Sequence, residues 1–347
     1  MASLDGVLGA ARGGEPAMHT SSLDPCQQSL PRNRLADFLP QSAAVAPKAA
    51  IAPPPLITLV LPFFNEAGYI ERTIASLARQ NDRRFALRLV DNASTDDSVA
   101  RAEAACAQLV DVEVRFMSEA TPGKIHALVT GLADIETPFL ATLDADTLYP
   151  PEYIGTCIAL FHANPGAAAV MAIGLCCTLG PAARRRAIWL TRLRSTLFRS
   201  KCHSGAYAQS FRTAAYKGAG GYDLSLWDYV LEDHEIVHRI SRFGHLVYDT
   251  GHSCTTSDRR TDRTTVSWSV GERLLYAVIP ISMMHWYFDV FLRNRFQRRE
   301  LFNLNLRTLA PRPAHGMEGD VAAFCTTPQY GKPASAPSPN TTEPTTH

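Results

Sequence analysis

Between residues 56 and 143, short runs rich in apolar residues alternate with stretches whose apolar residues recur at helical spacing. The short runs predict four strands, at residues 56–61, 87–90, 112–117 and 139–143. The first predicted helix carries Ile70, Ile74 and Leu77 on one face, with Asn65 as its expected N-cap, and two more helices follow at residues 98–107 and 125–132. This alternation indicates right-handed crossovers between parallel strands. We therefore expect an α/β fold with a mostly parallel central sheet flanked by helices.

Composition changes at both ends of this region. Residues 1–55 are rich in Ala, Pro, Ser and Gly, and residues 311–347 hold seven prolines and six threonines with little apolar content. Such segments cannot offset the entropy lost on ordering. We expect a disordered N-terminal arm at 1–55, a folded domain at 56–310 and a disordered C-terminal tail at 311–347.

Charge and cysteine content narrow the class of protein. The chain has 34 Lys and Arg against 33 Asp and Glu, and this balance argues against a nucleic-acid partner. Its eight cysteines include no C-x-x-C pair, which is typical of a reducing compartment. The sequence shows neither a secretory signal nor an apolar run of about 20 residues. We expect a cytoplasmic protein.

Polar residues follow the predicted strands, at the sheet edge where parallel α/β folds bind ligands. Asp144 and Asp146 come after the fourth strand and, being two residues apart, can share one hard cation such as Mg²⁺ or Mn²⁺. Lys124 precedes the third helix and can pair with a phosphate. An isolated D-x-D is more often a solvated turn. Several strand-end motifs in succession, with neither G-x-G-x-x-G nor a Walker loop, favour a metal-held diphosphate instead.

A longer series of motifs carries a family resemblance. It consists of Leu61-Pro62 to Glu66, a D-x-x-S-T-D segment from Asp91, Gly123-Lys124, Asp144-Ala145-Asp146, Gly205-Ala206, Gly220-Gly221-Tyr222-Asp223 and Leu231-Glu232-Asp233-His234. In this order, over about 200 residues, the series resembles the family-2, inverting glycosyltransferases of the GT-A fold. The resemblance implies a nucleotide-sugar-binding half at 56–151, an acceptor half at 152–270 and C-terminal amphipathic helices at 271–310.

The resemblance also implies a role for each matching residue. Pro62, Phe63 and Glu66 would line the nucleoside pocket, Asp91 would read the base of the donor beside Asn92 and Ser94, and Lys124 would lie near the phosphates. Asp144 and Asp146 would hold the metal and diphosphate, with Asp146 as the more direct ligand. Asp233 matches the general base, with Glu232 beside it.

Three departures from the family pattern qualify these roles. The frequent D-D-G-S is replaced by Asp91-Asn92-Ala93-Ser94, and Val129 stands where many members carry Asn. The Q-x-x-R-W motif of processive synthases is absent, which favours transfer of a single sugar.

The segment from Ser257 to Arg260 resembles an S-x-R-R motif, in which Arg259 and Arg260 would bind diphosphate or an acidic acceptor.

The function that follows is metal-dependent, inverting transfer of one sugar from a nucleotide-sugar to an acceptor hydroxyl. The expected cofactor is Mn²⁺ or Mg²⁺, and the expected acceptor is a glycan, a polysaccharide precursor or a lipid-linked molecule. A positioned carboxylate, Asp233, would take the hydroxyl proton, and the metal would stabilise the departing diphosphate. A non-catalytic nucleotide-sugar-binding protein of the same fold is the alternative.

A competing motif lies next to Asp233. Residues 234–238 read H-E-x-x-H, the pattern of a zinc-binding helix in hydrolases. A third ligand at a suitable distance is hard to find, and a zinc hydrolase would leave the strand-end motifs unexplained. We interpret His234 and His238 as one face of the helix after Asp233.

Two amphipathic stretches suggest a surface partner. Residues 183–201 carry seven basic residues and no acid, with Trp189, Leu193 and Leu197 on one face. This pattern fits either a membrane-surface helix or a solvated helix packed on the domain. Residues 274–292 predict a buried helix kinked near Pro280, or a second surface element. Together they make peripheral attachment to an anionic membrane, at its inner face, an open alternative.

Overall fold

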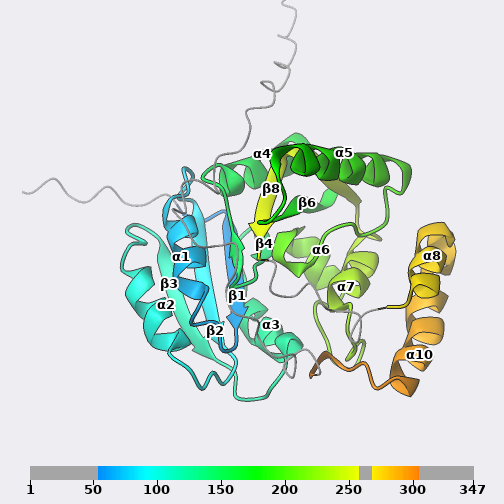
Figure 1. Ribbon diagram of the computed structural model, residues 1–347, viewed down its shortest axis with the longest axis horizontal. Coiled ribbons are helices and arrows are strands. Elements are labelled where there is room, and N and C mark those ends of the chain that lie inside the picture. The colour runs from blue at the N-terminus through cyan, green and yellow to red at the C-terminus, as the bar shows by residue number, and fades with distance from the viewer. Residues whose placement is uncertain (1–53, 258–267, 305–347) are drawn as a thin grey trace, which may run out of the picture. The chain divides into compact units, whose positions relative to one another are not determined.

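The structure is a computed structural model that describes residues 54–257 and 268–304. The predicted arm up to residue 53, the predicted tail and the two arginines Arg259 and Arg260 lie outside the described residues. The described part contains an eight-stranded sheet with the order β3-β2-β1-β4-β7-β6-β8-β5 (Figure 1).

The first half of the sheet has the predicted alternation. Strands β1 (Ile57–Phe63), β2 (Phe85–Asp91), β3 (Glu113–Ser118) and β4 (Phe139–Thr142) pair in parallel, and helices α1 (Ile70–Ala78), α2 (Ser98–Cys106) and α3 (Lys124–Leu132) connect them. One local prediction is wrong. The N-cap of α1 is Tyr69 rather than Asn65. Asn65 lies in the loop at φ 53°, where its side-chain oxygen accepts a 2.8 Å hydrogen bond from the Thr95 amide.

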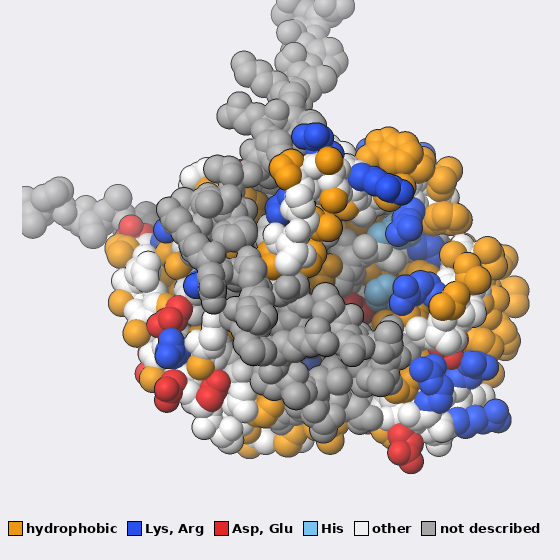
Figure 2. Space-filling view, in the orientation of Figure 1, with side chains coloured by type: hydrophobic (Ala, Val, Ile, Leu, Met, Phe, Trp, Pro, Cys, Tyr) orange, Lys and Arg blue, Asp and Glu red, His pale blue; other side chains and the backbone are white. Residues whose placement is uncertain are grey.

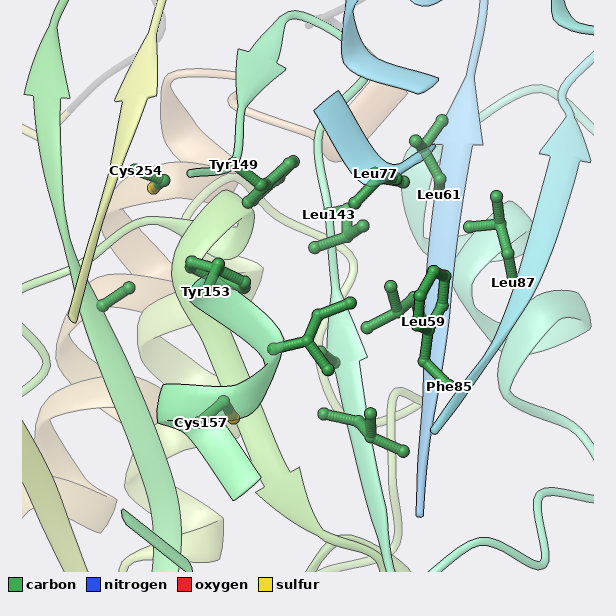
Figure 3. Packing of buried hydrophobic residues seen from close by; sticks show 14 of the residues in the cluster. Leu59, Leu61, Leu77, Phe85, Leu87, Leu143, Tyr149, Tyr153, Cys157 and Cys254 are labelled. Atoms are coloured by element: carbon green, nitrogen blue, oxygen red, sulfur yellow. The ribbon is translucent and has the colours of Figure 1, made fainter. Parts of the chain in front are cut away.

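Alternate residues of β1 enter different hydrophobic clusters, as expected for a strand buried on both faces. Leu59 and Leu61 pack in a cluster with residues of α1, α2 and α4 (Tyr153–Ala163), part of which Figure 3 shows. Val60 belongs to a second cluster with residues of α3, α6 (Thr213–Gly218) and α7 (Glu232–Ile240). Helices therefore cover both faces of the sheet, which confirms the expected α/β class.

In the second half of the sheet, two strands run against the direction of the others. Strand β7 (Gln209–Arg212) pairs antiparallel with both β4 and β6 (Ala167–Cys176). Strand β8 (His245–Thr256) then runs parallel to β6, and the two-residue β5 (Thr147–Leu148) pairs antiparallel with its end. Because β8 runs in the same direction as β4, the chain after β8 reaches the loop between β4 and β5.

The C-terminal helices form an aromatic cluster of their own. Helix α8 (Val270–Val278) ends before Pro280, and α9 (Met284–Trp286), a π-helical segment (Tyr287–Leu292) and α10 (Arg293–Arg298) follow. The predicted break near Pro280 is confirmed. Trp227, Tyr276 and Phe288 are buried in this cluster. Among the described residues, we find no helix with the length and hydropathy needed to cross a bilayer.

The packing of α3 on the sheet can be tested by substituting two glycines, one in α3 and one in α4. A Cβ at Gly131 would lie 2.4 Å from a Val60 methyl and 2.8 Å from a Val90 methyl, whereas a Cβ at Gly155 of α4 meets its nearest atom at 3.5 Å. Gly131→Ala should lower the free energy of unfolding by about 1–3 kcal/mol through overpacking. Gly155→Ala should leave it unchanged or raise it by up to about 1 kcal/mol. Urea unfolding measures both, and equal stabilisation by the two substitutions would contradict this packing.

Candidate active site

The Asp144-Ala145-Asp146 loop follows β4 and is held by its main chain. The Asp144 amide donates to the Tyr149 hydroxyl (3.2 Å), and the Ala145 carbonyl accepts from the Thr73 hydroxyl (2.7 Å). The Asp146 carbonyl accepts from the Ser257 amide at 3.1 Å. Two distant residues, Thr73 and Ser257, and the nearby Tyr149 therefore determine where the two carboxylates lie.

Asp144 and Asp146 are both buried, with exposed fractions of 9% and 6%. Asp144 pairs with Lys124, whose Nζ lies 2.7 Å from its Oδ1. Asp146 Oδ2 accepts a 2.8 Å hydrogen bond from the Ser257 hydroxyl. The alternative interpretation of the D-x-D motif, a solvated acidic turn, does not fit carboxylates that are this deeply buried.

Lys124 is the first residue of α3, directly after Gly123. Gly123 has φ 135°, a conformation that glycine adopts without strain and that other residues rarely adopt. From here the Lys124 ammonium reaches Asp144 and also lies 3.9 Å from Glu232 Oε1. The structure thus brings together a strand-end carboxylate, a helix-start lysine and the first residue of α7.

Glu232 is buried, with an exposed fraction of 6%. Burial, and next the charge of Asp233, raise the pKa of Glu232, while Lys124 acts in the opposite direction. The Glu232 carboxyl group is therefore better placed to interact with the charged groups around it, such as Lys124, than to contact a substrate from solvent.

Asp233 lies in the first turn of α7, which begins after Leu231 at φ 68°. Its Oδ1 accepts from the His234 amide and lies 2.8 Å from His234 Nδ1, and its Oδ2 accepts from the Ala206 amide at 3.2 Å. Gln209 donates to the Asp233 carbonyl. These contacts set the direction of a carboxylate that remains partly exposed.

The loop after β2 joins the loop after β1. Asp91 Oδ1 accepts from the Ser94 amide (3.1 Å), and the Ser94 hydroxyl accepts from the Asn65 amide (3.1 Å). The buried Asn92 side chain accepts from the Gly123 amide and donates to the carbonyls of Glu119 and Thr121. Asn92 therefore fixes the loop that precedes Lys124, a structural role that the sequence did not suggest.

The residues predicted to line the nucleoside pocket are buried in the structure. The role of Phe63 as a pocket-lining residue stays a prediction; its side chain is 3% exposed and packs in the core cluster beneath α1. Alternation along β1 explains this, because Phe63 shares a face with Leu59 and Leu61. Pro62 and Glu66 are also buried. The Glu66 amide donates to the Ser98 hydroxyl at 2.6 Å, which ties the loop to α2.

Several residues of the site were not predicted from the sequence. Thr73, Tyr149 and Ser257 hold the Asp144-Ala145-Asp146 loop, and His234 holds Asp233. Ser257 had one signal, its place at the start of the S-x-R-R-like segment. His234 also stood in a motif, because it directly follows Asp233. Thr73 and Tyr149 carry no local motif, because Thr73 is distant in sequence from its partner and Tyr149 accepts from a backbone amide.

The H-E-x-x-H residues are engaged in packing and ion pairing. Glu235 is buried and binds Arg239 through both carboxylate oxygens, at 2.6 and 2.9 Å. His238 stacks on Phe288, and burial lowers its pKa to about 4. His234 faces Asp233. A glutamate paired in this way is not available to activate water, so the geometry disfavours the zinc hydrolase.

The donor set fits a hard cation. Asp144 and Asp146 offer carboxylate oxygens, which Mg²⁺ and Mn²⁺ prefer. Within the described ranges, no group of three or more His, Cys, Asp or Glu side chains is arranged to hold a metal. A site that uses one or two carboxylates and completes its shell with water and diphosphate oxygens needs no such group.

A double-mutant cycle tests the Lys124–Asp144 pair. Lys124→Met should lower the free energy of unfolding by about 2 kcal/mol, since it leaves two buried carboxylates without this cation. Asp144→Asn should be less costly in that background, with a coupling energy of about 1–2 kcal/mol. The half-exposed Arg101–Glu71 pair, at 3.2 Å, is the control and should couple by less than about 0.5 kcal/mol. Equal coupling in urea unfolding of the two cycles would contradict the buried pair.

Comparisons with known proteins show which family part of the chain resembles. Residues 58–217 match the family described as Glycosyl transferase family 2. An undecaprenyl-phosphate 4-deoxy-4-formamido-L-arabinose transferase of Shewanella sediminis is 30% identical over 107 residues, which is 30% of this chain and 32% of that protein. A validoxylamine A glucosyltransferase of Streptomyces hygroscopicus is 31% identical over 127 residues, or 35% of this chain and 29% of that protein. The chain thus spans less than a third of the length of these curated relatives.

A solved structure gives the fold. The mannosyltransferase PcManGT of Pyrobaculum calidifontis superposes with a TM-score of 0.52 at 20% identity, over 60% of this chain and 59% of that one. The predicted mostly parallel sheet, the strand-end motifs and the family match all agree. The chain has the GT-A fold, and its residues 58–217, just under half of its length, match glycosyl transferase family 2.

Proposed function

We propose that this protein transfers one sugar from a nucleotide-sugar to an acceptor hydroxyl, with inversion at the anomeric carbon. The observation that carries the proposal is the convergence of Lys124, Asp144 and Glu232 next to Asp233. A lysine and hard-cation ligands suit a diphosphate, and an oriented carboxylate beside them suits a hydroxyl.

Asp233 is proposed as the general base. It takes the proton of the acceptor hydroxyl as the hydroxyl oxygen forms a bond to the anomeric carbon. The bond between that carbon and the diphosphate oxygen breaks on the opposite face, and the electron pair leaves with the nucleoside diphosphate. The hydrogen bonds from the amides of Ala206 and His234 support this role, because they hold the carboxylate in one direction.

Asp144 and Asp146 are proposed to hold Mn²⁺ or Mg²⁺ with the donor diphosphate, and the cation supplies positive charge that stabilises the departing diphosphate. The PcManGT structure, which contains GDP-Man and Mn²⁺, supports this assignment. Lys124 would pair with a diphosphate oxygen. The residues that remain proposals for the nucleoside side of the site are Pro62, Phe63, Glu66, Asp91, Asn92 and Ser94. Arg259 and Arg260 remain proposals for the phosphate or acceptor side.

The acceptor is proposed to be a glycan, a polysaccharide precursor or a lipid-linked molecule. The relative from Shewanella sediminis is named for an undecaprenyl-phosphate acceptor, which supports the lipid-linked class. The absence of the Q-x-x-R-W motif from the sequence supports transfer of one sugar at a time.

Replacing the proposed base tests the mechanism. Asp233→Asn keeps the size of the side chain and should lower kcat about 10²- to 10⁴-fold, because the amide cannot take a proton. Nucleotide binding should be unchanged. Asp111→Asn, at an exposed turn outside the motifs, is the matched control and should retain activity. Release of nucleoside diphosphate in the presence of acceptor measures the rate, and normal turnover by Asp233→Asn would refute the assignment.

A panel of nucleotides tests the donor site. UDP, GDP, CDP, ADP and dTDP are added with and without Mn²⁺, and thermal unfolding is followed. Ligand at about 100 times its Kd stabilises by about 2.7 kcal/mol, which raises the Tm by about 5–10 °C in a domain of this size. We expect this shift for one nucleotide, and only with Mn²⁺; Asp146→Asn should remove it. Stabilisation by zinc, with no shift from any nucleotide, would contradict the proposal and favour a zinc protein.

A further inference from the structure

Two helical segments outside the site expose large apolar side chains. Helix α5 (Pro181–Leu197) leaves Trp189 61% and Leu197 65% exposed. On α8, Leu274 is 62% and Val278 75% exposed. A helix packed only on its own domain turns such residues inward.

Helix α5 also carries an excess of positive charge. Residues 181–201 contain no Asp or Glu, and Arg185, Arg186 and Arg194 are exposed. Two other arginines are used within the domain, since Arg184 donates to the Thr255 hydroxyl and Arg192 to the Tyr248 carbonyl. These contacts attach the helix to β8 while its cationic and apolar side chains stay at the surface.

The apolar rows of the two segments are neighbours. The chain after α5 reaches Lys201, whose ammonium donates to the Ile279 carbonyl (2.9 Å) and contacts Met284 Sδ (2.8 Å). Ile281, in the same stretch, is 52% exposed. Figure 2 shows hydrophobic side chains over α5 and over α8 on the same side of the view, with Lys and Arg side chains between and beside them. We call this surface the α5–α8 face.

The inner side of α8 reaches the candidate active site. Tyr276 is buried with its ring 5.8 Å from that of His234, and Trp268 lies 5.0 Å from both rings. His234 in turn contacts Asp233. One helix therefore has apolar residues exposed on its outer side and contacts the neighbour of the proposed base on its inner side.

We propose that the α5–α8 face docks on the surface of an anionic phospholipid bilayer. Apolar side chains flanked by arginines match an interface in which acyl chains lie beneath negative headgroups. A second copy of this chain is disfavoured as the occupant, because a symmetric contact would place the α5 arginines of the two copies together. Docking in this way places the Asp233 side of the domain beside the membrane. It does not depend on the transfer reaction.

Vesicle co-sedimentation of the full chain tests the proposal. The protein should sediment with vesicles that mix phosphatidylcholine and phosphatidylglycerol, and much less with phosphatidylcholine alone. Added salt should weaken binding, because it screens the arginines from the headgroups. Equal binding to the two kinds of vesicle, or none to either, would overturn the proposal.

Two sets of variants separate the apolar and cationic contributions. Replacing Arg185, Arg186 and Arg194 by Gln should weaken binding about a hundredfold, at about fivefold for each arginine. Leu274→Ser with Val278→Ser should weaken it about tenfold or more. Val110→Ser with Phe116→Ser removes exposed apolar residues near β3, at the opposite edge of the sheet, and should change nothing.

Thermal unfolding of each variant shows whether it is folded. Equal loss of binding in the control variant would mean general stickiness and would overturn the proposal. Sedimentation velocity without vesicles tests the other occupant. A dimer that dissociates on Leu274→Ser with Val278→Ser would assign the face to a second copy of the chain and would also overturn it.

Discussion

Burying carboxylates at the edge of a sheet is the constraint on which the rest of this site depends. Asp144, Asp146 and Glu232 are each less than a tenth exposed. Charges taken out of water at this depth persist only where opposite charge and hydrogen-bond donors surround them. Lys124 and Ser257 supply part of this compensation, and a divalent cation with a diphosphate would add charges of both signs in the same place. A protein that used this edge only for structure would be more stable with apolar residues there.

The antiparallel strand β7 beside β4 makes the arrangement possible. An all-parallel continuation would carry the later strands onward with their ends at one edge, whereas antiparallel β7 turns the chain back. Gln209 is the first residue of β7 and Ala206 lies in the 3₁₀ turn just before it, and both hydrogen bond to Asp233. The residue proposed to act on the acceptor is therefore fixed to the strand beside the one that carries Asp144. Asp144 and Asp233 lie close together because the strands that position them, β4 and β7, are neighbours in one sheet.

Sequence patterns predicted those parts of the fold that have a period or a local motif. The buried strands, α1 to α3, Asp144, Asp146 and Lys124 were found in this way, because each depends on residues close in the chain. The sequence did not show that Tyr149 and Thr73 hold the Asp144-Ala145-Asp146 loop, since Thr73 lies 72 residues from its partner Ala145. Asn65 was misassigned because an Asn before a helix can equally serve a loop at positive φ. Family position alone does not say which face of a strand a side chain enters, so the sequence did not show that Phe63 packs in the core cluster beneath α1.

Helix α8 links the surface of the domain to its chemistry. Its Glu272 is almost fully buried, completes a capping box with Ser269 and pairs with Arg295 and Arg299. These bonds fix the helix against α10 and leave its rotation little freedom. Tyr276 must then remain beside His234 while Leu274 and Val278 remain outside. An acceptor with an apolar tail and a polar head would match these two sides. The exposed apolar side of α8 suits the tail, and the side that faces His234 suits the head. The distance between the two environments is then the width of one helix, about 10 Å.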